Sequence, residues 1–324
     1  MTEHRRITPP SGEPEGRKRR SLIERAGDVF GTDRLGPFAV PRDLPEPRRP
    51  VADPAPPEQP ARAPAGDLGP AAPPPRVEPA VALAGPRQSV DRERLRDEGL
   101  IVPEEPVTGQ LEEFRIVKRE LLAEARGADD PLARRILVCS PHPGEGKTYC
   151  AANLAIAMAA TRDIEVVLVD ADTVKPSVTQ RFGIEGGPGL LDVLADPAIR
   201  PESCVIRTDI EGLFVLPSGS ATSRDSEYLA SARTGEVLDR LTRGAPNRIL
   251  IFDTPPALAA SPAAELARHV GQALLVVRAD ETSRAALEDA RQLLSACPDI
   301  KLLLNAARYS PSGRRFGDYG KARD

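Results

Sequence analysis

Residues 140–148 read SPHPGEGKT and decide the interpretation of the whole chain. They follow an apolar run, RILVCS, and precede a helical pattern that continues YCAANLAIAMAA. A glycine-rich turn between a strand and a helix directs backbone N–H groups toward a phosphate, and Lys147 and Thr148 add a positive charge and a magnesium-binding hydroxyl. Pro141 stands where such loops usually carry their first glycine. We therefore predict a phosphate-binding loop in which the remaining amides make the contacts.

Apolar runs and helical patterns alternate through the rest of the chain. A helical stretch, GQLEEFRIVKRELLAEA, precedes the loop, and later helical stretches include SEYLASARTGEVLDRLTR and SRAALEDARQLLSAC. The apolar runs are RILVCS, EVVLVDAD, LFVLPSG, RILIFDTPP, ALLVVRAD and KLLLNAA. Strands that are apolar on both faces and separated by helices form parallel sheets covered on both sides. The pattern predicts an α/β fold, with a doubly wound and mostly parallel sheet, over residues 109–308.

Three aspartates follow apolar runs at the points where predicted strands end. Asp170 and Asp172 close EVVLVDAD, and Asp253 closes the apolar part of RILIFDTPP. One such aspartate is commonly a helix cap or a loop residue. Three of them downstream of a phosphate-binding loop favour a magnesium and phosphoryl-transfer site, because ligands of doubly wound sheets bind at the carboxyl ends of the strands.

Composition limits the classes of function. The 324 residues are 28% charged with a formal net charge of −4, which gives no sign of a nucleic-acid partner. The four cysteines have no CxxC spacing, so neither a disulfide framework nor a cysteine metal site is predicted. No apolar stretch approaches the roughly 18 residues of a membrane span, and the start MTEHRRITPP lacks the apolar core of a signal peptide. We expect a cytoplasmic protein that does not cross a membrane by itself.

The first third of the chain has a different composition. Residues 42–86 are rich in proline and alanine and poor in large apolar residues, and a disordered linker is expected over 42–108. In the preceding tail, 1–41, Ser21 and Glu24 have capping-box spacing and predict a short amphipathic helix over 21–30. The basic run before it, RKRR, is either a solvated charge run or a contact with an acidic membrane surface or a partner.

These motifs carry a resemblance to a known family. SPHPGEGKT, VVLVDADTVKPSV and ILIFDTPPAL resemble the Walker A, A′ and B motifs of the bacterial tyrosine kinases (BY-kinases) that control exopolysaccharide production. That family shares the departure from the usual first glycine. SLIERAGDVFG, VDRERLRDEGLIVPEEP, EEFRIVKRELL, GLLDVLADP and VLPSG are closest to the exosortase-associated, exopolysaccharide-locus tyrosine autokinases. The resemblance covers nearly the whole chain apart from the proline-rich linker. It implies a P-loop NTPase domain and an ATP-dependent protein-tyrosine autokinase that uses Mg²⁺.

The resemblance also implies roles for individual residues. The residues implied to hold ATP are Pro143, Gly144, Glu145, Gly146, Lys147, Thr148, Tyr149 and Asn305. The residues implied to act in catalysis are Lys147, Asp170, Asp172 and Asp253, and those implied to hold Mg²⁺ are Thr148, Asp170 and Asp253. Two alternatives stay open at this point: Asn305 as an ordinary strand-end turn residue, and Tyr149 as a packed residue of the helix.

Assembly and the tail are the last expectations. Glu112, Arg115 and Lys118 match a family helix motif that implies subunit contacts in a ring, and the alternative is ordinary surface pairing along one helix. The flexible tail, 309–324, carries Tyr319 and Tyr309 as phosphate acceptors, and transfer between subunits is expected.

The implied partner is a membrane-bound polysaccharide chain-length protein, which would recruit the chain to the inner face of the plasma membrane. Because the tail has fewer tyrosines than is usual in the family, a second reading stays open. In that reading the chain is an ATP-switched assembly partner of the chain-length protein with little kinase activity.

Overall fold

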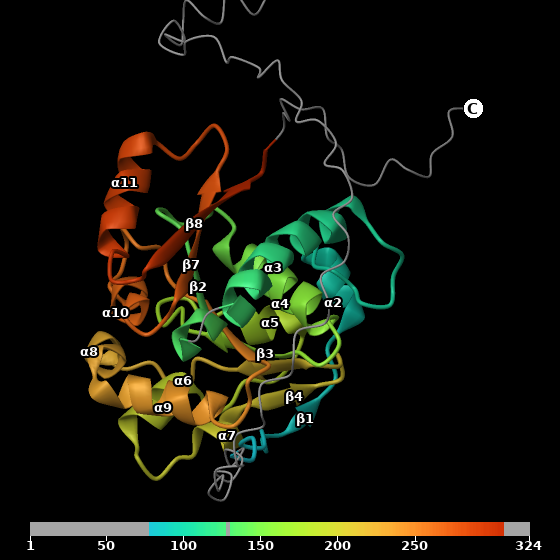
Figure 1. The fold of residues 1–324 in the computed structure, drawn as a ribbon, viewed down its shortest axis with the longest axis vertical. Coiled ribbons are helices and arrows are strands. Elements are labelled where there is room, and N and C mark those ends of the chain that lie inside the picture. Colours follow the sequence, from blue (N-terminus) through green and yellow to red (C-terminus); the bar gives the residue numbers. More distant parts are fainter. Residues whose placement is uncertain (1–77, 128–129, 308–324) are drawn as a thin grey trace, which may run out of the picture. The chain divides into compact units, whose positions relative to one another are not determined.

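The computed structural model describes residues 78–127 and 130–307. Within these residues an eight-stranded sheet has the strand order β1-β4-β5-β3-β6-β2-β7-β8 (Figure 1). The strands are β1 Arg87–Gln88, β2 Arg135–Cys139, β3 Glu165–Asp170, β4 Ile206–Thr208, β5 Leu213–Leu216, β6 Arg248–Asp253, β7 Gln272–Arg278 and β8 Asp299–Asn305. Neighbouring strands are parallel except that β4 and β5 pair antiparallel. The predicted doubly wound, mostly parallel fold is therefore confirmed.

Helices cover both faces of the sheet. One face carries α2 Arg92–Asp97, α3 Gly109–Gly127, α4 Lys147–Ala159 and α5 Val178–Phe182 (Figure 1). The other face carries α6 Leu190–Ala195, α7 Pro201–Cys204, α8 Asp225–Ala230, α9 Ala232–Thr242, α10 Pro262–Ala267 and α11 Arg284–Leu293. A 3₁₀ turn, η2 Pro131–Arg134, leads into β2. Each face therefore has its own apolar core, with the central strands contributing alternate side chains to each.

Local sequence explains the central elements. Every residue of β2 and β6 is buried, as expected for strands in the middle of a sheet with helices on both faces. Helix α4 is buried along most of its length, which explains why its sequence is apolar all round instead of amphipathic. The helical stretch SEYLASARTGEVLDRLTR forms two helices, because Ser231 is extended and its hydroxyl donates to the Tyr228 carbonyl at 2.6 Å.

Residues 78–107 differ from the sequence expectation, which placed them in the disordered linker. They form β1 and α2, and Leu95, Leu100 and Ile101 are buried in the core. The expected linker ran too far because its proline-rich composition ends near residue 86. Beyond that point the chain has enough apolar side chains to offset the entropy of ordering.

We call residues 87–105 the N-terminal clamp, because they form hydrogen bonds with two helices of the domain, α4 and α5. The Asp91 carboxylate caps α2, and the Asp91 N–H donates to the Phe182 carbonyl of α5 at 2.9 Å. Gly183, at φ +63°, lies so close that an added methyl group would overlap the Asp91 Cβ. On the other side, the Ile101 N–H donates to the Asn153 side chain of α4 at 2.7 Å. The clamp therefore connects α4 with α5.

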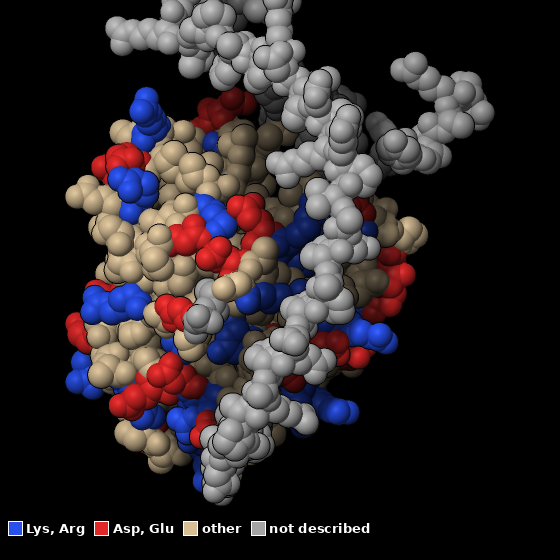
Figure 2. Space-filling model, in the orientation of Figure 1, with Lys and Arg blue, Asp and Glu red and all other residues tan. Residues whose placement is uncertain are grey.

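Several expectations fall outside the described residues. These are the helix at 21–30, the linker before residue 78, and the tail from residue 308 onward with Tyr309 and Tyr319. In the part of the chain that the structure describes, no helix has the length and apolar character needed to span a bilayer. On the face shown in Figure 2, acidic and basic side chains are interspersed over the described surface instead of gathering into one patch.

Candidate active site

Sheet topology brings the motif residues together. Strands β3, β6 and β2 are neighbours, and Asp170 at the end of β3 is in register with Asp253 at the end of β6. Asp253 is also in register with Val138 of β2, the strand that leads into the P-loop, residues 140–148. Parallel strands that end at one edge therefore place the glycine-rich loop and the two aspartates side by side.

The P-loop is braced from within the domain. Gly144 and Gly146 have φ angles of +85° and +95°, which glycine adopts without strain. The buried Glu145 carboxylate accepts from the His142 N–H at 2.8 Å and from the Thr282 hydroxyl. Glu145 therefore supports the loop through its side chain, and any contact with phosphate would come from its backbone.

Asn305 also contacts the P-loop. Its side-chain amide donates to the Glu145 carbonyl at 2.8 Å. A methyl group on residue 146 would overlap the same amide nitrogen, so Gly146 is required for this close approach. The family resemblance implied that Asn305 holds ATP, with an ordinary strand-end turn residue as the alternative. In the structure it holds the end of β8 against the loop.

Lys147 pairs with one of the motif carboxylates. Its Nζ lies 2.6 Å from Asp172 Oδ2, and both side chains are largely buried. The other oxygen, Asp172 Oδ1, accepts from the Lys175 N–H at 2.9 Å. An incoming phosphate would compete with Asp172 for Lys147. The ion pair between Lys147 and Asp172 is therefore exchangeable, because a phosphate can replace the carboxylate.

Asp170 is held by the start of α5. The residue is 1% exposed, and its Oδ2 accepts from the Ser177 and Val178 N–H groups at 2.9 Å each. Burial raises the pKa of the Asp170 carboxyl to about 6, although these hydrogen bonds favour the charged form. The position of Asp170 therefore depends on α5, and through α5 on the N-terminal clamp.

Asp253 has no such support. It is fully buried, and neither carboxylate oxygen has a hydrogen-bond partner among the described residues. Burial raises its pKa to about 7, while the nearby Lys147 acts in the opposite direction. Unsatisfied oxygens in a buried carboxylate beside the Thr148 hydroxyl fit the oxygen-only preference of Mg²⁺.

A magnesium site here would not be complete without the nucleotide. Within residues 78–127 and 130–307, no group of three or more His, Cys, Asp or Glu side chains is arranged to hold a metal ion. Mg²⁺ is often bound by one or two carboxylates together with substrate phosphates and waters. The donor set of Thr148, Asp170 and Asp253 therefore fits the ion as a partner of bound phosphate.

The remaining predicted residues lie around α3. The Tyr149 hydroxyl accepts from the Gln110 side chain at 2.8 Å, and its ring meets Phe114 edge-on, so Tyr149 is both packed and adjacent to the P-loop. On α3, Arg115 pairs with Glu112. Lys118 instead donates to the Ala157 carbonyl of α4 at 2.8 Å, and burial lowers its pKa. Glu112 and Arg115 of the helix motif thus pair with each other, whereas Lys118 contacts α4.

A cavity of about 580 Å³ adjoins the P-loop. Besides motif residues, its lining includes Glu98 of the clamp and Gln180 and Arg181 of α5. Sequence reasoning did not identify these three as site residues. Glu98 lies in the quoted stretch VDRERLRDEGLIVPEEP, but only the fold brings it to Arg181, 83 positions away.

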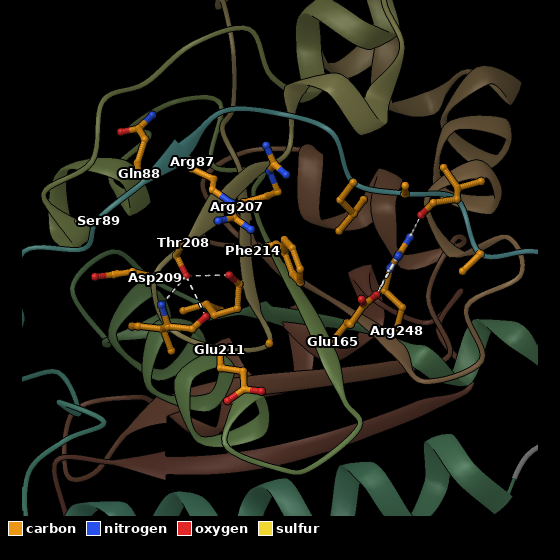
Figure 3. A pocket seen from close by; sticks show the side chains of 17 residues that line it. Arg87, Gln88, Ser89, Glu165, Arg207, Thr208, Asp209, Glu211, Phe214 and Arg248 are labelled. Atoms are coloured by element: carbon orange, nitrogen blue, oxygen red, sulfur yellow. Dashed lines mark hydrogen bonds and ion pairs between the residues drawn. The ribbon is translucent and has the colours of Figure 1, made fainter.

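Another cavity, of about 710 Å³, lies at the opposite ends of the strands (Figure 3). Glu165 begins β3 and Arg248 begins β6, so this cavity is remote from the P-loop. Arg248 donates to Glu165 at 2.8 Å and to the Val81 carbonyl at 3.0 Å, as the dashed lines in Figure 3 show. These internal contacts attach residue 81 to the sheet and give no indication of chemistry.

Known proteins of similar sequence identify the family. The chain is 34% identical over 226 residues to the putative tyrosine-protein kinase EpsB of Ralstonia nicotianae, covering 67% of this chain and 28% of that protein. It is 30% identical over 223 residues to the tyrosine-protein kinase YwqD of Bacillus subtilis, covering 68% of this chain and 91% of YwqD. The chain belongs to the bacterial tyrosine-protein kinase family. The family resemblance inferred from the motifs is thereby confirmed.

Two further comparisons define the extent of the match. The kinase domain of the Escherichia coli tyrosine kinase ETK is 25% identical, with a TM-score of 0.50, over 58% of this chain and 72% of that domain. No protein-family model matches the chain. The chain spans less than a third of the length of the EpsB proteins of Ralstonia. The family is therefore shown by a match to part of the longer EpsB proteins and by a match that covers 91% of YwqD.

Proposed function

We propose that the chain is an ATP-dependent protein-tyrosine kinase that phosphorylates its own tail and regulates exopolysaccharide production. The observation that carries the proposal is the exchangeable pair between Lys147 and Asp172 beside the P-loop. Lys147 would leave Asp172 to contact the phosphates of ATP, and this exchange would free a carboxylate at the place where an acceptor hydroxyl is needed. One contact would thus couple nucleotide binding to the preparation of the acceptor site.

The chemistry assigns a separate task to each carboxylate. A tyrosine hydroxyl, with a pKa near ~10, is a weak nucleophile at neutral pH, and Asp172 would accept its proton as the new O–P bond forms and the bond to ADP breaks. Thr148, Asp170 and Asp253 would hold Mg²⁺, which neutralises negative charge on the phosphates when it is bound. Lys147 and the glycine amides of the P-loop would hold the phosphates in line.

The remaining assignments follow the family resemblance. Tyr319 would be the main acceptor, ahead of Tyr309, because it lies farther along the tail and reaches a neighbouring subunit more easily. Glu112 and Arg115 would contribute to a homo-oligomeric ring, with Lys118 anchored on α4. A membrane-bound polysaccharide chain-length protein would recruit the kinase to the inner membrane surface, with the N-terminal helix at 21–30 as a second contact.

The test is to incubate the purified full chain with ATP and Mg²⁺ and to map phosphotyrosine by mass spectrometry. Wild type should be labelled on Tyr319 and Tyr309, and Lys147→Met should not be, because the P-loop lysine contacts the phosphates. Lys301→Met, which removes a lysine paired with Asp299 on β8, is the matched control and should be labelled normally. ATP hydrolysis by wild type without any phosphotyrosine would favour an ATP-switched assembly protein.

Transfer between subunits has its own test. Lys147→Met retains both tail tyrosines but lacks the phosphate contact, whereas a Tyr309→Phe, Tyr319→Phe double variant retains the site but lacks the acceptors. A mixture of the two should restore phosphotyrosine on the Lys147→Met chain. If the mixture stays unlabelled while wild type is labelled, transfer does not occur between subunits.

A further inference from the structure

The cavity beside the P-loop contains more positive charge than the motifs supply. Lys147 and Arg181 of α5 both line the cavity, and Glu98 of the clamp lines it too. Each of these two cations is paired with a carboxylate that also lines the cavity, Lys147 with Asp172 and Arg181 with Glu98. In both pairs a cation and a carboxylate that line the cavity neutralise each other. The family motifs include the Lys147–Asp172 pair but not the Arg181–Glu98 pair.

The pair between Arg181 and Glu98 is too exposed to be explained by stability alone. The two side chains are 30% and 29% exposed. An ion pair this accessible to water contributes about 0–1 kcal/mol. Its position on the cavity wall therefore needs another explanation.

Arg181 also has hydrogen-bonding capacity that Glu98 does not use. Its Nε is buried and has no hydrogen-bond partner among the described residues. A guanidinium offers five N–H donors in a fixed fork, and a phosphate group presents more acceptor oxygens and more negative charge than a carboxylate. A phosphate entering the cavity is therefore a stronger partner for Arg181 than Glu98 is.

We propose that Arg181 is a second phosphate-binding cation of this site, which Glu98 occupies until a phosphate group displaces it. The ligand is a phosphate monoester or polyphosphate, either the phosphates of a nucleotide or the phosphotyrosine that the reaction produces. The inference rests on the proposed function, since it places its ligand in the cavity beside the P-loop. It extends that function by adding a residue that the Walker motifs do not contain.

Exchange at Arg181 reaches beyond the cavity. Glu98 is the C-cap residue of α2, and its N–H donates to the Arg94 carbonyl at 3.0 Å to close that helix. Release of Arg181 removes one of the links between the clamp and α5, while the hydrogen bond from Asp91 to Phe182 remains. Phosphate in the cavity would thus loosen one of the contacts through which the clamp holds α5.

The experiment measures the binding of AMP, ADP, ATP and O-phosphotyrosine to the full chain by calorimetry, with EDTA and again with Mg²⁺. Arg181→Gln should weaken binding of the relevant ligand about 10-fold, because a charge-assisted hydrogen bond is lost. Glu98→Gln should tighten it about 3- to 5-fold, because the competing carboxylate is neutralised. The double variant should bind like Arg181→Gln, since Glu98 acts only through Arg181.

Arg92→Gln is the matched control. Arg92 belongs to the same clamp and pairs with Glu104 and Asp209, but it does not line the cavity. This variant should leave phosphate binding unchanged. Thermal unfolding of each variant without ligand identifies a general loss of structure, and the expected gain in affinity of Glu98→Gln cannot arise from misfolding.

The outcomes separate the ligand sources and the two proposals. Effects that grow from AMP to ATP identify nucleotide phosphate, and effects confined to O-phosphotyrosine identify the product; either result supports the inference. If wild type binds ATP but neither variant changes any affinity, Arg181 is not a phosphate ligand and the inference is overturned while the proposed function stands. If wild type binds no nucleotide, the proposed function fails first and the inference fails with it.

Discussion

Replacing Asp253 with asparagine should stabilise the protein at about pH 8 in the presence of EDTA. Asp253 is 0% exposed, and burial raises its pKa from 3.8 to about 7. Because the unfolded chain ionises this group freely, each pH unit between those two values destabilises the folded state by about 1.4 kcal/mol, or about 4 kcal/mol in all. An asparagine removes that penalty but leaves a buried amide without partners, which costs about 1–3 kcal/mol. The expected net gain in unfolding free energy is about 1–3 kcal/mol.

The pH dependence gives the prediction its sign. At about pH 3 and below, Asp253 is protonated in both the folded and the unfolded state, so its contribution to stability is intact. That contribution is lost as the pH rises through the folded-state value of about 7. The advantage of Asp253→Asn over wild type should therefore shrink by about 3 kcal/mol between about pH 8 and pH 5. Urea unfolding followed by circular dichroism measures both differences.

Asp170→Asn is the internal comparison. Asp170 is equally buried, but its Oδ2 accepts two backbone N–H groups from Ser177 and Val178. Removing its charge weakens both charge-assisted hydrogen bonds, so this variant should gain less stability than Asp253→Asn. The reasoning is refuted if Asp253→Asn lowers stability by the same amount at both pH values, because the carboxylate would then be satisfied in the folded state.

Three more predictions follow from the site and the clamp. With ADP present, added Mg²⁺ should raise the melting temperature of wild type more at about pH 8 than at about pH 5.5, since the ion binds ionised carboxylates together with phosphate. The same addition should raise the melting temperature of Asp253→Asn less, and an equal shift in the variant would exclude Asp253 as a ligand. Gly146→Ala should abolish nucleotide binding and reduce the unfolding free energy by about 1–3 kcal/mol, because residue 146 has φ +95° and its methyl group would overlap Asn305. Adding Asn305→Ala to the same chain should recover only part of that free energy, because the positive φ remains. Full recovery in calorimetry would show that the positive φ costs nothing. Leu95→Ala should reduce the unfolding free energy by about 2–5 kcal/mol, because Leu95 is 0% exposed. Urea unfolding measures this change, and a value below about 0.5 kcal/mol would show that the clamp does not unfold together with the core.

The central part of the fold was predictable because its determinants are local. The run into β2, the glycine-rich loop and α4 are contiguous, and each of the strand-end aspartates follows a strand long enough to be recognised. Parallel pairing then brings these segments together without further information. The same argument explains why Asp170 and Asp253 were identified from sequence before their register was known.

What sequence did not predict depends on short elements and distant contacts. β1 has 2 residues and β4 has 3, which is too short for any period to be visible. Glu98 and Arg181 pair although they are 83 positions apart in the sequence, and no sequence pattern around either residue predicts the contact. The role of Asn305 as a brace of the P-loop depends on its approach to Gly146, which only three-dimensional packing establishes.

The N-terminal clamp contacts two helices that lead to different parts of the site. Upstream of the clamp the chain is attached to the domain separately, because Arg248 donates to the Val81 carbonyl and the Val81 N–H donates to the Arg243 carbonyl. The clamp itself touches α5 at Phe182 and α4 at Asn153. A force applied to the clamp itself would be shared between α4, which begins at the P-loop, and α5, whose N-terminal amides hold Asp170. The two helices that the clamp contacts thus lead to the P-loop and to Asp170, one of the motif carboxylates. A molecule that touched only the clamp would therefore act on both ends of the site without entering the cavity.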